Sequence, residues 1–357
     1  NGINWLARLS SKTAGNYENA YDGKVYNSGF KELNFNGIVG INKKWGYSQL
    51  HFSNFNQALG LIEGERDSLG NFMKLSVVNG TTVEEKSVTK NDLRGYGIDI
   101  PRQGINHFKV ATTNKLFLKN TSLSLNFAFQ QNSRKEFADP VNPQATELFF
   151  LLNTFNYDIK YLFPEIKDWQ TSLGINGMQQ SSYNKGEEFL IPEYNLFDVG
   201  VFALTQKSFN KFHLSGGFRY DVRNISSLAL YLDANDEPII ASDAISSVKF
   251  GDFKTTYSNV SGSVGGSYRL TEKFLVKLNG SRGFRSPNIA ELGSNGLHEA
   301  TFRYELGNTQ LKPETSLQID VGLQYSSKHV SLELAVFNNA IQNYIFLQKL
   351  NSVGGGD

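Results

Sequence analysis

Residues 211–223 read KFHLSGGFRYDVR, and the alternation within this segment decides the fold class. One parity carries apolar or small side chains: Phe212, Leu214, Gly216, Phe218, Tyr220 and Val222. The other parity carries mostly polar ones: Lys211, His213, Ser215, Gly217, Arg219, Asp221 and Arg223. Successive side chains of a β-strand point to opposite faces of a sheet, so the pattern predicts a strand with one apolar face and one polar face. A helix would instead repeat apolar residues every third or fourth position.

The same alternation recurs along the chain and predicts about thirteen strands. They are expected near residues 1–12, 30–42, 45–57, 104–117, 120–133, 147–163, 168–182, 194–208, 211–224, 254–269, 273–285, 315–326 and 329–346. Short polar turns alternate with the long connectors 13–29, 58–103, 134–146, 183–193, 225–253 and 286–314. This alternation puts every short turn at one rim and every long loop at the other, as outer-membrane barrels arrange their periplasmic turns and extracellular loops. The connector 58–103 is long enough that we expect it to carry structure of its own or to order with a ligand.

Composition agrees with a membrane barrel. Phe, Tyr and Trp make up 13% of the 357 residues, and no run of about 18 apolar residues predicts a transmembrane helix. The 35 basic and 34 acidic side chains form no basic tract, which argues against a nucleic-acid partner. The lack of cysteine excludes disulfides and thiolate metal sites. We therefore predict an all-β fold, a transmembrane antiparallel up-and-down barrel whose polar parity faces the lumen. Closed bacterial barrels have an even number of strands, so about thirteen are expected to be part of a larger barrel.

Several motifs occur in order near the end of the chain: GFRSPNIAEL (283–292), GSNGLHEATFRYELGN (293–308), LKPE (311–314), DVGLQY (320–325) and NNAIQNYIF (338–346). With the opening NGINWLARLSSKTAGNY (1–17), they resemble the TonB-dependent outer-membrane receptors, particularly the Bacteroidetes-type branch. The resemblance spans nearly the whole chain. It implies that residues 1–357 are a partial β-barrel domain of a barrel of 22 strands, with the plug domain and the C-terminal strands not in this chain.

The resemblance also implies a function. Such receptors lie in the outer membrane of Gram-negative bacteria, among its lipids, and import siderophore-iron, haem or metal ions with energy that TonB delivers through the plug. A surface lipoprotein or another assembly partner is a further possibility. Two alternatives stay open: a passive porin-type channel, and a barrel component of a surface-protein or secretion assembly without transport of its own. An enzyme is not expected, because the chain has no HExxH, GxSxG or P-loop pattern. No cofactor is expected either.

The connector 286–314 holds the candidate ligand-binding residues. His298 and Glu299 could hold a borderline metal or haem iron, since imidazole and carboxylate are suitable ligands. Arg285 and Arg303, with Arg282, could attract an anion, and Tyr304 could stack on a planar ligand. The plainer interpretation, which the sequence favours, is a folded loop whose histidine only makes a hydrogen bond and whose arginines bind loop backbone or lumen carboxylates.

Overall fold

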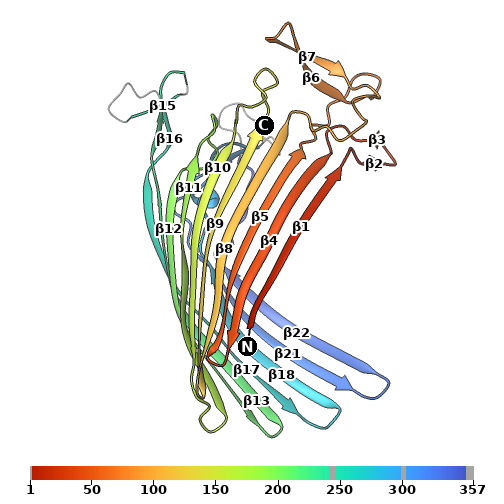
Figure 1. Cartoon of the computed structure of the whole chain (residues 1–357). Coiled ribbons are helices and arrows are strands. Elements are labelled where there is room, and N and C mark those ends of the chain that lie inside the picture. Colours follow the sequence, from red (N-terminus) through yellow and green to blue (C-terminus); the bar gives the residue numbers. More distant parts are fainter. Residues whose placement is uncertain (1, 236, 241–246, 299–302, 351–357) are drawn as a thin grey trace.

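The computed structural model describes residues 2–235, 237–240, 247–298 and 303–350, hereafter the described residues. Thirteen long strands form one antiparallel sheet in which each strand pairs with the long strands before and after it in the sequence. They are β1 (Gly2–Ala14), β4 (Phe30–Lys43), β5 (Gly46–Gly60), β8 (Arg102–Leu118), β9 (Thr121–Phe137), β10 (Phe149–Leu162), β11 (Trp169–Asn184), β12 (Tyr194–Phe209), β13 (Phe212–Ser227), β17 (Phe253–Arg269), β18 (Phe274–Arg285), β21 (Glu314–Ser326) and β22 (Ser331–Gln342). The sheet curls into an open trough with β1 and β22 as its edges (Figure 1). The predicted fold class and the predicted set of thirteen strands are confirmed.

The two parities of each long strand lie on the two faces of the trough. On β13, Phe218 and Tyr220 are 56% and 41% exposed on the outer face, whereas Arg219 and Asp221 lie on the inner face and bond to each other. The outer face therefore presents an apolar surface of the kind that lipid solvates, and the inner face presents polar groups to a lumen. No described helix is long and apolar enough to cross a membrane.

The two ends of the trough differ as the connector lengths predicted. Tight turns join the strands at one end, here called the turn end, and long connectors join them at the other, the loop end (Figure 1). The loop end carries small elements that the alternation did not predict: β2 (Glu18–Asn19), β3 (Gly23–Lys24), β6 (Met73–Val78), β7 (Thr82–Ser87), β14 (Leu230–Leu232), β15 (Pro238–Ile239), β16 (Ser247–Phe250), α1 (Ile289–Gly293), β19 (Asn295–His298) and β20 (Arg303–Leu306). The connector between β5 and β8 thus has structure of its own, the β6–β7 hairpin.

Buried apolar residues gather at the loop end and not along the wall. One cluster joins the wall to the connector between β18 and β21, and consists of Tyr194, Leu196, Ile225, Tyr257, Ile289 and Leu292. A second cluster joins the first two long connectors, through Val25, Tyr26 and Phe72. The wall is one sheet thick with lipid on one side and lumen on the other, so packed cores form where connectors fold back on the rim.

Candidate functional site

Residues 286–313, here called the inner loop, begin with the short helix α1. Asn288 caps this helix: its Oδ1 accepts a hydrogen bond from the backbone N of Glu291, and the Glu291 carboxylate accepts one from the backbone N of Asn288. This reciprocal capping box satisfies backbone donors at the start of the helix. Leu292 is 1% exposed and packs with Ile289 against the wall residues of the first cluster. The inner loop is therefore docked on the lumen face of the wall.

An arginine fixes the base of the inner loop. Arg285, the last residue of β18, forms ion pairs with Glu291 at 2.7 Å and with Glu314 at 2.5 Å. Glu314 is the first residue of β21 and also accepts a hydrogen bond from the backbone N of Ile345 at 2.7 Å. Arg285 thus links α1 to the strand on which the inner loop ends.

Two further contacts close the inner loop on itself and on the wall. The Tyr257 hydroxyl donates to the carbonyl oxygen of Leu311 at 3.1 Å. Gly307 passes so close to α1 that a Cβ atom there would lie 2.5 Å from the carbonyl carbon of Leu292. Real Cβ contacts are longer than this, so the approach requires glycine at this position.

The β19–β20 hairpin of the inner loop carries three of the predicted ligand residues: His298, Arg303 and Tyr304. His298 lies opposite Arg303, and Leu297 lies opposite Tyr304 in the register of the two strands. Tyr304 is 58% exposed, and its hydroxyl donates to Oδ1 of Asn295 at 2.7 Å. Glu299 lies outside the described residues. The backbone register of the hairpin therefore pairs His298 with Arg303.

Asn295 joins the hairpin to two other connectors. Its Nδ2 donates to the carbonyl oxygen of Lys249 at 2.7 Å, and its backbone N donates to the carbonyl oxygen of Leu190 at 3.2 Å. Three of the long connectors, 185–193, 228–252 and the inner loop, are held together by this one residue. No local sequence pattern marks Asn295 for this role, because its partners Lys249 and Leu190 are distant in sequence.

Arg282 does not share the face of Arg285. It pairs with Gly262 on β17 and with Leu317 on β21, and Leu317 is 56% exposed on the outer face. Its guanidinium donates to the carbonyl oxygen of Val260. The two arginines are three residues apart on one strand, so they point to opposite faces. Arg282 therefore cannot belong to an anion-binding rim in the lumen mouth.

The first two long connectors, 15–29 and 61–101, form a second folded unit, here called the outer loop body. The Tyr26 hydroxyl donates to Asp99 at 2.9 Å, and the Asn27 side chain donates to the carbonyl oxygen of Pro101 at 2.7 Å. Arg66 forms an ion pair with Asp22 at 2.5 Å, and the same guanidinium lies 3.9 Å from the ring centre of Phe72. These contacts make the outer loop body a packed structure with its own apolar cluster.

Burial and hydrogen bonds shift the pKa values of three ionisable groups in the outer loop body. Burial and the hydrogen bond to Asp99 raise the pKa of the Tyr26 hydroxyl. Burial opposes ionisation of Asp92, but hydrogen bonds from Lys74 and Thr89 outweigh it and lower the pKa of that carboxyl to about 2. Hydrogen bonds from the side chains of Asn71 and Ser87 likewise lower the pKa of Asp67 to about 2. Both carboxylates are therefore ionised at neutral pH.

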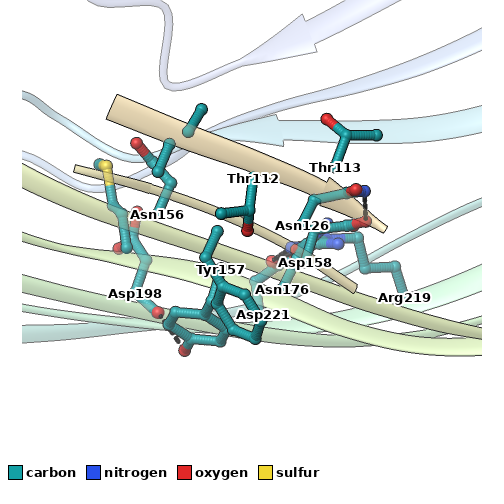
Figure 2. A pocket seen from close by; sticks show the side chains of 15 residues that line it. Thr112, Thr113, Asn126, Asn156, Tyr157, Asp158, Asn176, Asp198, Arg219 and Asp221 are labelled. Atoms are coloured by element: carbon teal, nitrogen blue, oxygen red, sulfur yellow. Dashed lines mark hydrogen bonds and ion pairs between the residues drawn. The ribbon is translucent and has the colours of Figure 1, made fainter. Parts of the chain in front are cut away.

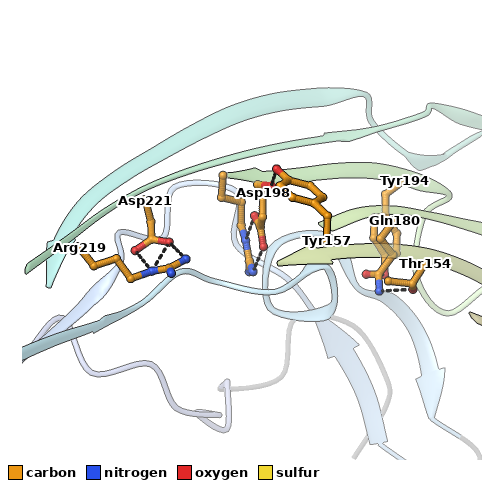
Figure 3. Close-up of polar contacts among 8 residues, drawn as sticks. Thr154, Tyr157, Gln180, Tyr194, Asp198, Arg219 and Asp221 are labelled. Carbon is orange, nitrogen blue, oxygen red and sulfur yellow. Dashed lines mark hydrogen bonds and ion pairs between the residues drawn. The ribbon is translucent and has the colours of Figure 1, made fainter. Parts of the chain in front are cut away.

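Two ion pairs lie on the lumen face of the wall below the mouth. Arg223 binds Asp198 with both oxygens accepting, at 2.8 and 2.7 Å, and Arg219 binds Asp221 on the same strand (Figure 3). Figure 2 shows the neighbouring cavity, of about 480 Å³, where Asn126 donates to Asp158 at 3.0 Å. These groups follow the polar parity predicted for the lumen face. Each ion pair gives both charged side chains a partner, which lowers the free-energy cost of placing charge on the wall.

No metal site of three ligands is formed among the described residues, because nowhere in them do three His, Asp or Glu side chains come together. His213, for example, lies at the turn end and shares a hydrogen bond of 3.0 Å with Ser208. Any metal at the tip of the inner loop would therefore take further ligands from its own chelate or from residues outside the described part.

Comparison with known proteins identifies the class. The family described as "TonB dependent receptor-like, beta-barrel" matches residues 3–357, and the chain belongs to it. The ferric enterobactin receptor of Pseudomonas aeruginosa is 26% identical over 141 residues, which cover 37% of this chain and 19% of the receptor. The FrpB iron transporter of Neisseria meningitidis (F3-3 variant) has a TM-score of 0.64 at 12% identity, covering 95% of this chain and 51% of its own. The Serratia marcescens hemophore receptor HasR, in complex with its hemophore HasA and heme, has a TM-score of 0.62 at 15% identity. The match covers 95% of this chain and 50% of the HasR chain.

The chain spans about half the length of the solved structures that it matches. Barrels of this family lie in the outer membrane of Gram-negative bacteria, and the family consists of transporters, not of enzymes. The loop end is consequently the extracellular end and the turn end the periplasmic one.

Proposed function

We propose that the protein containing this chain is an active-transport receptor that takes up a scarce solute, namely siderophore-bound iron, haem or a metal ion, with energy from the TonB system. The observation that carries the proposal is the docked inner loop. Its capping box, its buried Leu292 and its Arg285 ion pairs dock α1 on the wall, directly before the β19–β20 hairpin. A binding loop that is already ordered loses less entropy when a ligand arrives, which favours capture of a dilute solute.

Within this proposal, His298 and Glu299 are candidate ligands of a metal or of haem iron, because imidazole and carboxylate suit such metals. Arg303, opposite His298 in the hairpin, would bind a carboxylate of the solute. Tyr304 offers an exposed ring for stacking. We assign Arg285 an indirect part, since its guanidinium is occupied by Glu291 and Glu314 and holds the loop that carries the other four.

The rest of the protein is proposed from the family. A plug domain would fill the lumen and bind TonB, and further strands would close the barrel beyond residues 1–357. The motif block at 283–314 is the basis for assigning the Bacteroidetes-type branch. The relatives named above are receptors or transporters of ferric enterobactin, iron and hemophore-bound heme, which favours an iron complex as the solute. A surface lipoprotein that docks on the outer loop body would be an additional partner.

Calorimetry on the full-length receptor tests this function. Haem, zinc and a ferric siderophore are each titrated into the wild type, His298→Ala and the control His213→Ala, whose histidine lies at the periplasmic end. Loss of a metal ligand should weaken haem or zinc binding by at least about 2 kcal/mol, or roughly 30-fold, in His298→Ala alone. Equal binding of every probe by all three proteins would remove His298 from the site. Absence of binding by the wild type would favour the passive channel or the assembly component.

A further inference from the structure

The two ends of the barrel wall carry opposite charge. Ten basic side chains lie in the periplasmic turns or within three residues of them: Lys43, Lys44, Lys119, Lys160, Lys167, Lys207, Lys211, Arg269, Lys273 and Lys328. The same windows contain four acidic residues: Glu165, Asp168, Glu272 and Glu333. None of these ten cations forms an ion pair within the described part of the chain. The connectors of the extracellular end instead carry 22 acidic and 10 basic residues. The periplasmic rim is therefore a basic ring.

One part of this ring combines the charge with aromatic side chains. Lys207 lies opposite Trp169 in the register of β11 and β12, and its Nζ atom is 5.8 Å from the ring centre of Trp169 and 4.6 Å from that of Phe209. Phe209 in turn lies opposite Phe212 on β13, with ring centres 6.1 Å apart. This arrangement holds the ammonium group against two rings, with Phe212 packed beside the second.

The rings of Trp169, Phe209 and Phe212 lie on the lipid side of the wall. Lys207 and Phe209 belong to the same parity of β12 as Phe197 and Val201, which are 40% and 48% exposed on the outer face. Aromatic side chains on the outer face of a barrel collect at the depth of the lipid headgroups. Lys207 is thereby placed at headgroup depth in the periplasmic leaflet.

Two more cations, Lys167 and Lys211, lie in the turns that flank this point. Lys211 occupies the β12–β13 turn, and its carbonyl oxygen accepts a hydrogen bond of 2.8 Å from the backbone N of Arg269 on β17. Lys167 precedes Trp169 by two residues in the β10–β11 turn. Lys167 and Lys211 are exposed. Together with Lys207 they form what is here called the basic patch.

We propose that the basic patch binds the phosphate groups of anionic phospholipid, such as phosphatidylglycerol, in the periplasmic leaflet of the outer membrane. Each lysine or arginine close to a lipid surface attracts an anionic headgroup. The aromatic rings would lie along the glycerol and upper acyl region of the same lipid while Lys207 reaches the phosphate. A lipid fits better than a soluble acidic protein, because the rings that position Lys207 face the hydrocarbon side and not the periplasm.

Native mass spectrometry of the full-length receptor tests the proposal, with phosphatidylglycerol or phosphatidylcholine added to the solubilised protein. The test variant is Lys167→Gln/Lys207→Gln/Lys211→Gln. The control variant, Lys24→Gln/Lys90→Gln/Lys312→Gln, removes three exposed and unpaired cations of the extracellular end. Each removed charge should weaken binding about fivefold, so the test variant should bind phosphatidylglycerol on the order of 100-fold more weakly than the wild type. The single variant Lys207→Gln should show about a fivefold loss.

The proposal predicts that the control variant binds like the wild type and that phosphatidylcholine binds weakly to all variants. Equal phosphatidylglycerol binding by test variant and wild type would overturn it, and so would an equal loss in both triple variants. Inorganic phosphate is added as a competitor in a separate arm. If millimolar phosphate displaces the lipid, the patch is a site for free phosphate and the lipid proposal is wrong.

Discussion

Substitution of Leu292 by alanine would test whether burial of one side chain holds the inner loop in place. Leu292 is 1% exposed and contacts a cluster contributed by three wall strands. Removing a fully buried leucine costs about 2–5 kcal/mol, because both the transfer free energy and the packing around the new cavity are lost. The ion pairs of Arg285 contribute less, about 1 kcal/mol or below each, since its side chain is 42% exposed. Undocking of the loop should therefore become easier by about 3 kcal/mol, or on the order of 100-fold.

Hydrogen exchange followed by mass spectrometry, on the full-length receptor in lipid nanodiscs, measures this opening. Amides of α1 and of the β19–β20 hairpin should exchange on the order of 100-fold faster in Leu292→Ala, while amides of β12 and β13 stay protected. The matched control is Leu306→Ala in the same loop, whose side chain is 60% exposed and should change exchange by about twofold at most. Equal exchange of the loop amides in wild type and Leu292→Ala would refute the claim that this cluster docks the inner loop.

Three further substitutions test other contacts. The pKa of Asp92 is lowered from 3.8 to about 2, so its contact with Lys74 stabilises the outer loop body fully above pH about 4 and is lost as the pH falls through about 2. Exchange protection of the β6 amides, corrected for intrinsic rates, should fall further in that interval in the wild type than in Asp92→Asn, where, of these two carboxylates, only Asp67 still titrates. An equal fall in both proteins would contradict a role for the Asp92 contact. Gly307→Ala should loosen α1, because its Cβ would lie 2.5 Å from Leu292, whereas Gly97→Ala, with no atom within 4 Å, should leave exchange unchanged. Asn295→Ala should remove the hydrogen bonds to Lys249 and Tyr304 and destabilise the docked hairpin by about 1–2 kcal/mol. Limited proteolysis should then cleave between residues 295 and 306. Full resistance to the protease would argue against Asn295 as the link.

The long strands could be predicted from the sequence because each of them obeys a local rule. A wall with lipid on one face and a polar lumen on the other requires apolar and polar side chains to alternate along each strand. This alternation can be recognised in a window of about ten residues, as in 211–223. The order of short and long connectors then predicts which end of the barrel carries the tight turns and which carries the long loops. No knowledge of distant contacts was needed, since every long strand pairs with its neighbours in sequence.

The arrangement of the loop end could be predicted only in part. Asn288 and Glu291 stand at capping-box spacing before the apolar pair Ile289 and Leu292, so α1 had a local signal that the all-β interpretation passed over. The role of Asn295 had no such signal, because its partners Lys249 and Leu190 are distant in sequence. The opposite faces of Arg282 and Arg285 follow from the parity of the predicted strand 273–285, which matches β18. Connectors of this kind are specified by long-range contacts, and composition does not report those.

The central claim is that this chain is the wall of a receptor that imports its solute actively. Uptake of radiolabelled haem and of a ferric catecholate is measured in iron-starved cells that produce the full-length receptor, with TonB present or deleted. The account predicts accumulation of at least one probe that is lost when TonB is deleted and reduced when residues 286–313 are replaced by a short linker. Accumulation that is equal with and without TonB would show a passive channel and contradict the account.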